Sequence, residues 1–152
     1  MTEQSHTFCA VRMAREHLSA VAELERLCFS EPWSENALEL LLTEAATGYV
    51  VLLEERVIAY GGMMTVPGEG QITNIAVHPE HRRKGCGRAV VDALLSEARA
   101  HGAEQVSLEV RESNRAAAAL YERAGFFVAG RRKRFYRNPT EDAFVMLMRM
   151  TD

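Results

Sequence analysis

The sequence has few cysteines, no long apolar run and no leader-like opening. Cys9, Cys28 and Cys86 are odd in number, widely spaced and without a CxxC pair, which disfavours a disulfide framework or zinc site and predicts a reducing compartment. No apolar run approaches the ~20 residues that a membrane-spanning helix needs. The opening MTEQSHTF lacks the basic and apolar segments of a secretory signal. We therefore expect a cytoplasmic protein with no membrane partner.

Metal-ligand patterns, internal repeats and linkers are also missing. No histidine stands at ligand spacing with Asp, Glu or Cys, so no metal is expected; the five are His6, His17, His78, His81 and His101. The 152 residues, of which 47% are hydrophobic and 26% charged, suit one globular domain over 1–152.

Charge is present but unevenly placed. The net charge is -3, so the molecule as a whole is not built to bind polyanions. Five of the 18 Lys and Arg residues nevertheless fall in 131–137, and four more fall in 82–88. These two basic clusters need separate explanations.

Hydrophobic periodicity predicts an α/β protein. Helical spacing and capping residues predict helices over 17–29, 34–46, 88–100 and 114–124. Short β-rich runs predict strands over 8–13, 49–53, 57–65, 71–77, 106–110, 126–130 and 143–150, the last two around a basic loop. The resulting order β-α-α-β-β-β-α-β-α-β-β predicts a mixed sheet covered by helices.

The most informative segment is 74–88, where a strand runs through a basic loop into a helix. Gly85 and Gly87 stand at the helix start, where backbone N–H groups lack intrahelical partners and the helix dipole favours an anion. The loop is neither a Walker A sequence nor a dinucleotide fingerprint. A glycine turn with solvated basic residues is the alternative, but strand, basic loop and helix start together favour a pyrophosphate site.

The loop resembles a known family. The segment 82–87, Arg-Arg-Lys-Gly-Cys-Gly, is similar to the Q/R-x-x-G-x-G/A acetyl-CoA loop of the GNAT acetyltransferase superfamily. Further segments resemble its RimI-like group of ribosomal-protein-alanine N-acetyltransferases: 108–111, 113–114, 117, 119–121, 125–126, and also Phe29, 32–34 and 141–143. The resemblance implies the GNAT fold, a mixed and mostly antiparallel sheet flanked by helices.

The resemblance also implies how acetyl-CoA is held, without a metal. The strand residues that would meet the pantetheine arm are Ile75, Ala76 and Val77. The pyrophosphate would lie on the backbone of Arg83, Lys84, Gly85, Cys86, Gly87 and Arg88. Asn114 matches an asparagine that meets the other limb of the cofactor. Taken singly, the strand residues could be plain core and Asn114 a plain helix cap.

Glu109 is the candidate base for acyl transfer to an amine. It lies inside an apolar strand and points opposite to Leu108 and Val110, and an ionisable side chain there is costly unless it faces a cleft. The resemblance makes it the proton acceptor. The alternative is an exposed glutamate on an edge strand.

Tyr121 is the candidate acid. It follows four alanines on the helix 114–124, which leaves room for close packing, and the resemblance makes it the proton donor to the CoA thiolate. A core tyrosine is the alternative. Cys86 stands away from any His–acid pair, so we expect direct attack without an acyl-enzyme.

Two segments are candidates for peptide contact. Trp33 lies in an aromatic, helix-breaking connection, and Tyr136 matches the second of a tyrosine pair in RimI-like sequences, with Phe135 in place of the first. For Trp33 the alternative is ordinary core packing. For the segment that holds Tyr136 the alternative is a solvated cluster of basic residues.

We expect an N-terminal acetyltransferase that acts on the α-amine of a protein, with the N-terminal alanine of a small-subunit ribosomal protein as substrate. No direct contact with nucleic acid is expected. Three alternatives stay open: a GNAT enzyme for a lysine or a small-molecule amine, a non-catalytic acetyl-CoA binder, and an RNA- or ribosome-binding module that uses the cluster 131–137. RNA affinity without CoA binding would favour the last.

Overall fold

The computed structural model describes residues 8–150, so most of the opening MTEQSHTF and the last two residues of the expected domain lie outside it. The elements follow in this order: β1 (Ala10–Arg12), the 3-10 turn η1 (Arg15–His17), α1 (Leu18–Cys28), α2 (Glu35–Leu38), η2 (Glu39–Leu42), β2 (Ala46–Leu53), β3 (Arg56–Val66), β4 (Glu69–Val77), η3 (Pro79–His81), α3 (Cys86–Ala100), β5 (Gln105–Arg111), α4 (Arg115–Ala124), β6 (Phe127–Tyr136) and β7 (Glu141–Arg149). The predicted order of helices and strands is confirmed.

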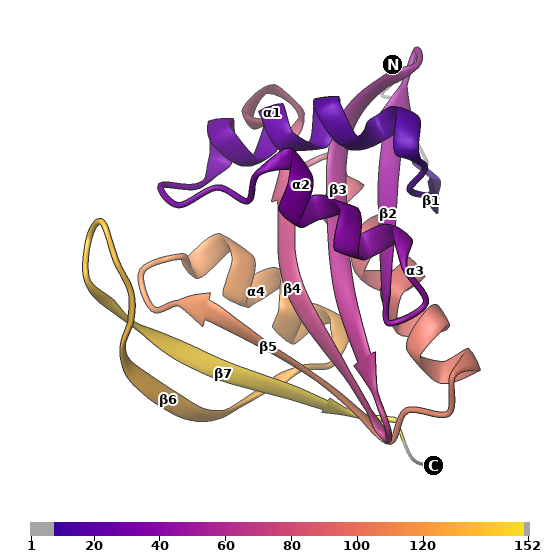
Figure 1. Cartoon of the computed structure of the whole chain (residues 1–152). Coiled ribbons are helices and arrows are strands. Elements are labelled where there is room, and N and C mark those ends of the chain that lie inside the picture. The colour runs from indigo at the N-terminus through magenta and orange to yellow at the C-terminus, as the bar shows by residue number, and fades with distance from the viewer. Residues whose placement is uncertain (1–7, 151–152) are drawn as a thin grey trace, which may run out of the picture.

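The strands form one sheet that opens in its middle. Its order is β1-β2-β3-β4-β5-β7-β6, and every neighbouring pair is antiparallel except β4 and β5. The parallel pair is joined only from Glu69↔Gln105 to Gln71↔Ser107. Beyond that point the two strands diverge, as Figure 1 shows. The sheet is therefore mixed and mostly antiparallel, as predicted.

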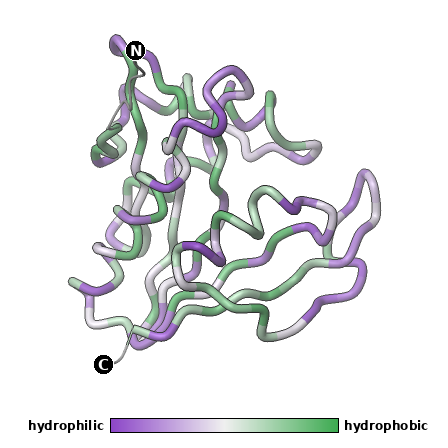
Figure 2. The backbone as a smooth tube through the Cα atoms, turned by 180° about the vertical axis from the view of Figure 1, so that it is seen from behind, coloured by the Kyte–Doolittle hydropathy of each residue, from purple (hydrophilic) through white to green (hydrophobic). Residues whose placement is uncertain are grey.

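Helices cover both faces of the sheet. Helices α1 and α2 lie over one face of β2, β3 and β4, and α3 lies on the other (Figure 1). The α1 side has its own core around Val21, Leu38 and Tyr60, and α3 packs through Val90 and Leu94 into the second core. Figure 2 shows the central strands as mainly hydrophobic, with hydrophilic stretches in the β6–β7 hairpin.

Two predicted boundaries differ most from the structure, the end of the helix 34–46 and the end of the strand 126–130. The helix expected over 34–46 begins correctly, with Ser34 accepting a hydrogen bond from the Ala37 N–H at 3.1 Å. It ends at Leu42 because Ala46 already pairs with Met64 in the β2–β3 ladder. The basic loop expected after residue 130 is mostly strand: β6 continues to Tyr136 along β7. Arg131–Arg134 are nevertheless exposed.

Local signals set the ends of α4. Asn114 accepts a hydrogen bond from the Ala117 N–H at 3.2 Å, and Gly125 ends the helix at φ 116°, a left-handed conformation that glycine adopts without strain.

Among residues 8–150, no helix is long and apolar enough to cross a membrane.

Candidate active site

A cavity of about 480 Å³ lies where β4 and β5 diverge. The α1–α2 connection, β4, β5, α4 and the end of β6 all contribute to its wall. The sequence-predicted residues among its lining are Trp33, Ile75, Glu109, Tyr121 and Tyr136. Residues from five separate segments thus meet at one place.

Glu109 faces this cavity because of strand alternation. In β5, Leu108 and Val110 are buried and alternate with Glu109, although they also line part of the cavity, and the Glu109 side chain keeps 30% exposure. The strand lies between β4 and β7 rather than at an edge, so the edge-strand alternative is wrong. Its Oε2 atom lies 3.3 Å from the Arg132 Nε atom. Glu109 is a carboxylate at a pocket wall, within reach of a cation.

Tyr121 lines the cavity from α4 while remaining buried, with 7% exposure. Its ring packs edge-to-face on Phe126, with ring centroids 5.9 Å apart. Burial raises the pKa of the Tyr121 phenol, and the nearby Tyr136 raises it further. The phenol therefore holds its proton at neutral pH. Tyr121 therefore packs in the core and lines the cavity at the same time.

The two predicted peptide contacts line the cavity from different elements. Trp33 is half-buried on the α1–α2 connection and Tyr136 is half-buried at the end of β6. Burial, together with the charge of Glu109, raises the pKa of Tyr136 to about 12. Phe135 also lines the cavity, with its ring 5.0 Å from that of Tyr136. Trp33 also packs against the core beneath α1.

Glu25 is a site residue that the sequence reasoning missed. It is fully buried in α1, where its carboxylate accepts hydrogen bonds from the Trp33 N–H at 2.9 Å, the Asn74 side chain at 2.7 Å and the Tyr60 hydroxyl. Trp33 and Asn74 both line the cavity, so Glu25 ties two of its walls together. A charged residue on the helix stripe of Leu18 and Val21 was the available signal.

The glycine loop, residues 82–87, has the backbone of an anion cradle. Arg83 and Gly85 have positive φ angles of 65° and 93°, and α3 begins directly after Gly85. The first N–H groups of a helix have no intrahelical acceptor. Lys84 and Arg88 are exposed beside them. The loop can therefore meet a phosphate with backbone donors and flanking cations.

Two loop residues face inward. The Cys86 side chain is buried in the core, and a Cβ on Gly87 would lie 3.1 Å from Leu120 Cδ2. Cys86 and Gly87 thus offer only backbone to a ligand, and Gly87 also allows α3 and α4 to pack closely. Neither residues 83–88 nor Asn114 line the cavity beside Glu109.

The strand residues 75–77 differ among themselves. Ile75 lines the cavity, Ala76 is buried against the α1-side core, and the Val77 carbonyl accepts a hydrogen bond from Arg82 Nε at 3.0 Å. From Ile72 onward, β4 pairs with β3 only. One backbone edge of β4 is consequently open toward the divergence, which suits a ligand that lies along it as a strand would.

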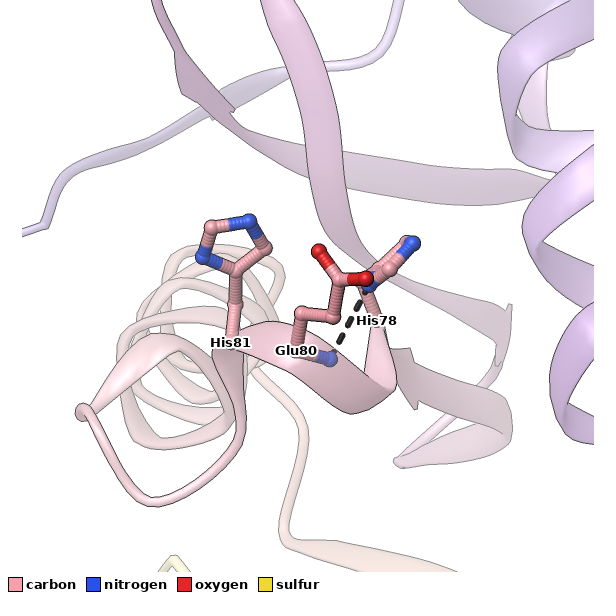
Figure 3. Close-up of side chains that lie close together, drawn as sticks. All are labelled: His78, Glu80 and His81. Atoms are coloured by element: carbon pink, nitrogen blue, oxygen red, sulfur yellow. Dashed lines mark hydrogen bonds between the residues drawn. The ribbon is translucent and has the colours of Figure 1, made fainter.

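The expectation that no histidine lies at ligand spacing is wrong. His78, Glu80 and His81 surround the turn η3 before the glycine loop, with one ligand atom from each within 4.8 Å of the others. Figure 3 shows the Glu80 carboxylate between the two rings. The His78 Nδ1 atom accepts a hydrogen bond from the Glu80 N–H at 3.1 Å. The three residues lie within four consecutive positions of the chain, and the proline-containing turn brings their side chains together.

Comparisons with known proteins find relatives of this chain in one family. The model of the acetyltransferase (GNAT) family matches residues 18–126. The chain is 35% identical over 135 residues to the ribosomal protein bS18-alanine N-acetyltransferase of Escherichia coli (strain K12), covering 86% of this chain and 90% of that protein.

Two further comparisons cover nearly the whole chain. It is 33% identical over 153 residues to the N-alpha-acetyltransferase RimI of Mycobacterium tuberculosis (strain ATCC 25618 / H37Rv), covering 96% and 95% of the two proteins. The crystal structure of the Escherichia coli ribosomal-protein-S18-alanine N-acetyltransferase superposes with a TM-score of 0.87 at 30% identity, covering 96% of each chain.

Proposed function

Because this chain belongs to the acetyltransferase (GNAT) family, we propose that it transfers the acetyl group of acetyl-CoA to the α-amine of a protein N-terminus. The resemblance and the fold predicted from the sequence are both confirmed. The observation that carries the proposal is that a carboxylate, Glu109, and a buried phenol, Tyr121, face one cavity at the divergence of β4 and β5.

The acceptor we propose is the N-terminal alanine of a small-subunit ribosomal protein. The name of the Escherichia coli relative gives the alanine of ribosomal protein bS18 as its acceptor, which supports this substrate. The name of the Mycobacterium tuberculosis relative supports acetylation of an α-amine. Chemistry supports it as well. An α-amine has a pKa near ~7.7–8.0 and a lysine near ~10.4, so a carboxylate base neutralises the N-terminus at a much lower cost.

Glu109 is the proposed base. Its carboxylate, directly or through water, accepts a proton from the α-ammonium, and the free amine nitrogen then attacks the thioester carbonyl carbon. As the new carbon–nitrogen bond forms, the carbon–sulfur bond breaks and its electron pair leaves on sulfur. The nitrogen then loses its second proton to solvent, and Glu109 releases the proton that it accepted, which leaves the neutral amide. In this structure the Glu109 Oε2 atom lies 3.3 Å from Arg132 Nε, so the substrate ammonium would meet the carboxylate beside that cation or in its place.

Tyr121 is the proposed acid. Its phenol is protonated at neutral pH, as that of an ordinary tyrosine is, and it lines the same cavity as Glu109. In the proposed step it donates that proton to the departing thiolate and recovers one from solvent afterwards. Proton transfer from a positioned side chain contributes roughly 10²–10⁴-fold to such a step. The chain supplies no nucleophile in this scheme.

Acetyl-CoA would be held by the elements between β4 and α3. The open backbone edge of β4 at Ile75 suits the pantetheine arm, whereas at Val77 the carbonyl is already bound by Arg82 and the Cys28 thiol. The N–H groups of 83–88 suit the pyrophosphate. The positive φ of Gly85 and the start of α3 at Cys86 support this assignment. Asn114 caps α4, and its proposed contact with the cofactor uses atoms beyond that capping bond.

The test measures thiol release from acetyl-CoA with two matched peptides. One carries a free N-terminal alanine, and the other is blocked at the N-terminus but carries a lysine. We expect turnover on the free N-terminus only. Turnover only on the blocked peptide would assign the enzyme to the class that acetylates lysine. Turnover on neither peptide, with small amines accepted instead, would exclude a protein substrate.

A further inference from the structure

We infer that Arg111 is a positioning residue that fastens the β6–β7 hairpin to the α1–α2 connection across the mouth of the cavity and thereby orients Tyr136. It lies at the end of β5, two residues after Glu109, on the same face of the strand. The role of Arg111 in peptide binding rests on the proposed function, whereas the contacts of its side chain do not depend on that function.

The turn of the hairpin is bound to Arg111 by two backbone hydrogen bonds. The guanidinium donates to the Arg137 carbonyl at 2.8 Å and to the Pro139 carbonyl at 3.0 Å. The β6–β7 pairing next to this turn is irregular between Arg132 and Tyr136, so these two hydrogen bonds add to a ladder that is incomplete there. A planar fork of N–H donors can satisfy several acceptors at once, which an ammonium group cannot do with the same geometry.

Glu141 fixes the guanidinium from the other strand of the hairpin. Arg111 Nη1 lies 3.1 Å from Glu141 Oε1, and the Ser113 N–H donates to the other carboxylate oxygen at 2.7 Å. The bond from Ser113 and that from Arg111 hold the pKa of Glu141 below its usual range. The segments 108–111 and 141–143, which the resemblance singled out without a role for Arg111 or Glu141, thus bind each other.

Arg111 also touches both walls of the cavity. Its guanidinium carbon lies 4.5 Å from the centre of the Tyr136 ring, a cation–π geometry. Its Nη2 atom lies 3.5 Å from Ser30 Oγ on the α1–α2 connection. The arginine itself lines the cavity, with only 23% of its side chain exposed. The Arg111 side chain therefore connects β5, the β6–β7 hairpin and the α1–α2 connection around the proposed peptide site.

Loss of the Arg111 side chain should affect only part of the site. Without its guanidinium group, the Arg137 and Pro139 carbonyls and the Glu141 carboxylate lose their common partner, and Tyr136 loses the cation next to its ring. The glycine loop and the edge of β4 make none of the Arg111 contacts described above. Loss of Arg111 should therefore weaken peptide binding and leave acetyl-CoA binding almost unchanged.

The experiment compares Arg111→Lys and Arg111→Met with wild-type protein, with Arg99→Met on the exposed end of α3 as the matched control. We expect the peptide KM to rise about tenfold for Arg111→Lys and further for Arg111→Met, since displacements of this kind are costly in positioned sites. The KM for acetyl-CoA should stay within about twofold. Equal changes in both KM values, or no change in the peptide KM, would overturn the inference.

A second readout does not depend on activity. Hydrogen exchange in fragments that cover 135–141 should become faster in Arg111→Met, and the fluorescence of Trp33, the single tryptophan of the chain, should change because Ser30 loses its contact. Unchanged exchange and fluorescence would overturn the positioning role. If wild-type protein acetylates no peptide, the proposed function fails, while this readout still decides whether Arg111 holds the hairpin.

Discussion

The glycine loop and the cavity beside Glu109 are built in opposite ways. The loop is part of one continuous stretch, a strand, a turn and a helix start, and its shape depends on backbone conformation at Arg83 and Gly85. The cavity joins segments that are distant in the sequence, and buried or half-buried side chains, Glu25 and Arg111, tie them together. Substitutions should therefore act through backbone strain in the loop and through lost side-chain contacts around the cavity.

The largest effect is expected at the reacting groups. Glu109→Gln and Tyr121→Phe keep the shape of each side chain and remove its proton chemistry. Each should lower kcat by about 10²–10⁴-fold, with little change in the affinity for CoA. Steady-state kinetics and calorimetric titration with CoA measure the two effects. Activity within about twofold of wild type would remove the residue from the mechanism.

The second effect tests the backbone of the loop. Gly85→Ala adds a Cβ at φ 93° with no atom within 4 Å, so only conformational strain opposes it, of order 1–3 kcal/mol. We expect about a tenfold rise in the KM for acetyl-CoA and an unchanged peptide KM.

Gly68→Ala is the matched control for the loop. It has φ 80° and equally free surroundings in the turn between β3 and β4. It should have a comparable effect on unfolding and leave both KM values unchanged. Equal kinetic effects of the two variants would contradict a ligand-binding role for the loop.

The third effect concerns the network beneath the cavity. In Glu25→Gln, an amide N–H₂ replaces an oxygen that accepts hydrogen bonds, so at least one buried donor loses its acceptor. We expect a loss of about 1–3 kcal/mol in the free energy of unfolding, measured by urea denaturation. The exposed Glu23 on the same helix is the control, and Glu23→Gln should have almost no effect. Equal stabilities would show that the Glu25 bonds are dispensable.

The smallest effect is a shift in titration. Burial raises the pKa of all four tyrosines, that of Tyr136 to about 12, whereas unfolded tyrosine titrates near ~10. The folded state binds these protons more tightly. The resulting stabilisation is complete below pH ~10 and is lost as the pH rises, through about 12 for Tyr136. Tyrosinate absorbance should therefore appear at higher pH in folded than in denatured protein. A folded midpoint near 10 would contradict the burial of these phenols.

The same contrast explains what the sequence could predict. The loop and its helix were predictable because strand, glycines and helix start are neighbours in the chain, and the order of elements followed from local periodicity. Glu109 was found because a charge interrupts an apolar strand. Its orientation toward a cavity then followed from alternation alone.

Other features depend on contacts between distant segments. The roles of Glu25 and Arg111 arise from partners as far away as Asn74 and Pro139. The helix expected to run to residue 46 ends early because β3 recruits Ala46 into the sheet, and β6 extends through its basic residues because β7 pairs with it. Tertiary pairing overrides local preference at these places.

The most direct test of the central claim uses one peptide that carries both a free N-terminal alanine and an internal lysine. After reaction with acetyl-CoA, fragmentation in a mass spectrometer locates the acetyl group. The account predicts acetylation of the N-terminal nitrogen alone with wild-type protein and its loss in Glu109→Gln. Acetylation of the lysine nitrogen, or equal modification by the Glu109→Gln variant, would contradict it.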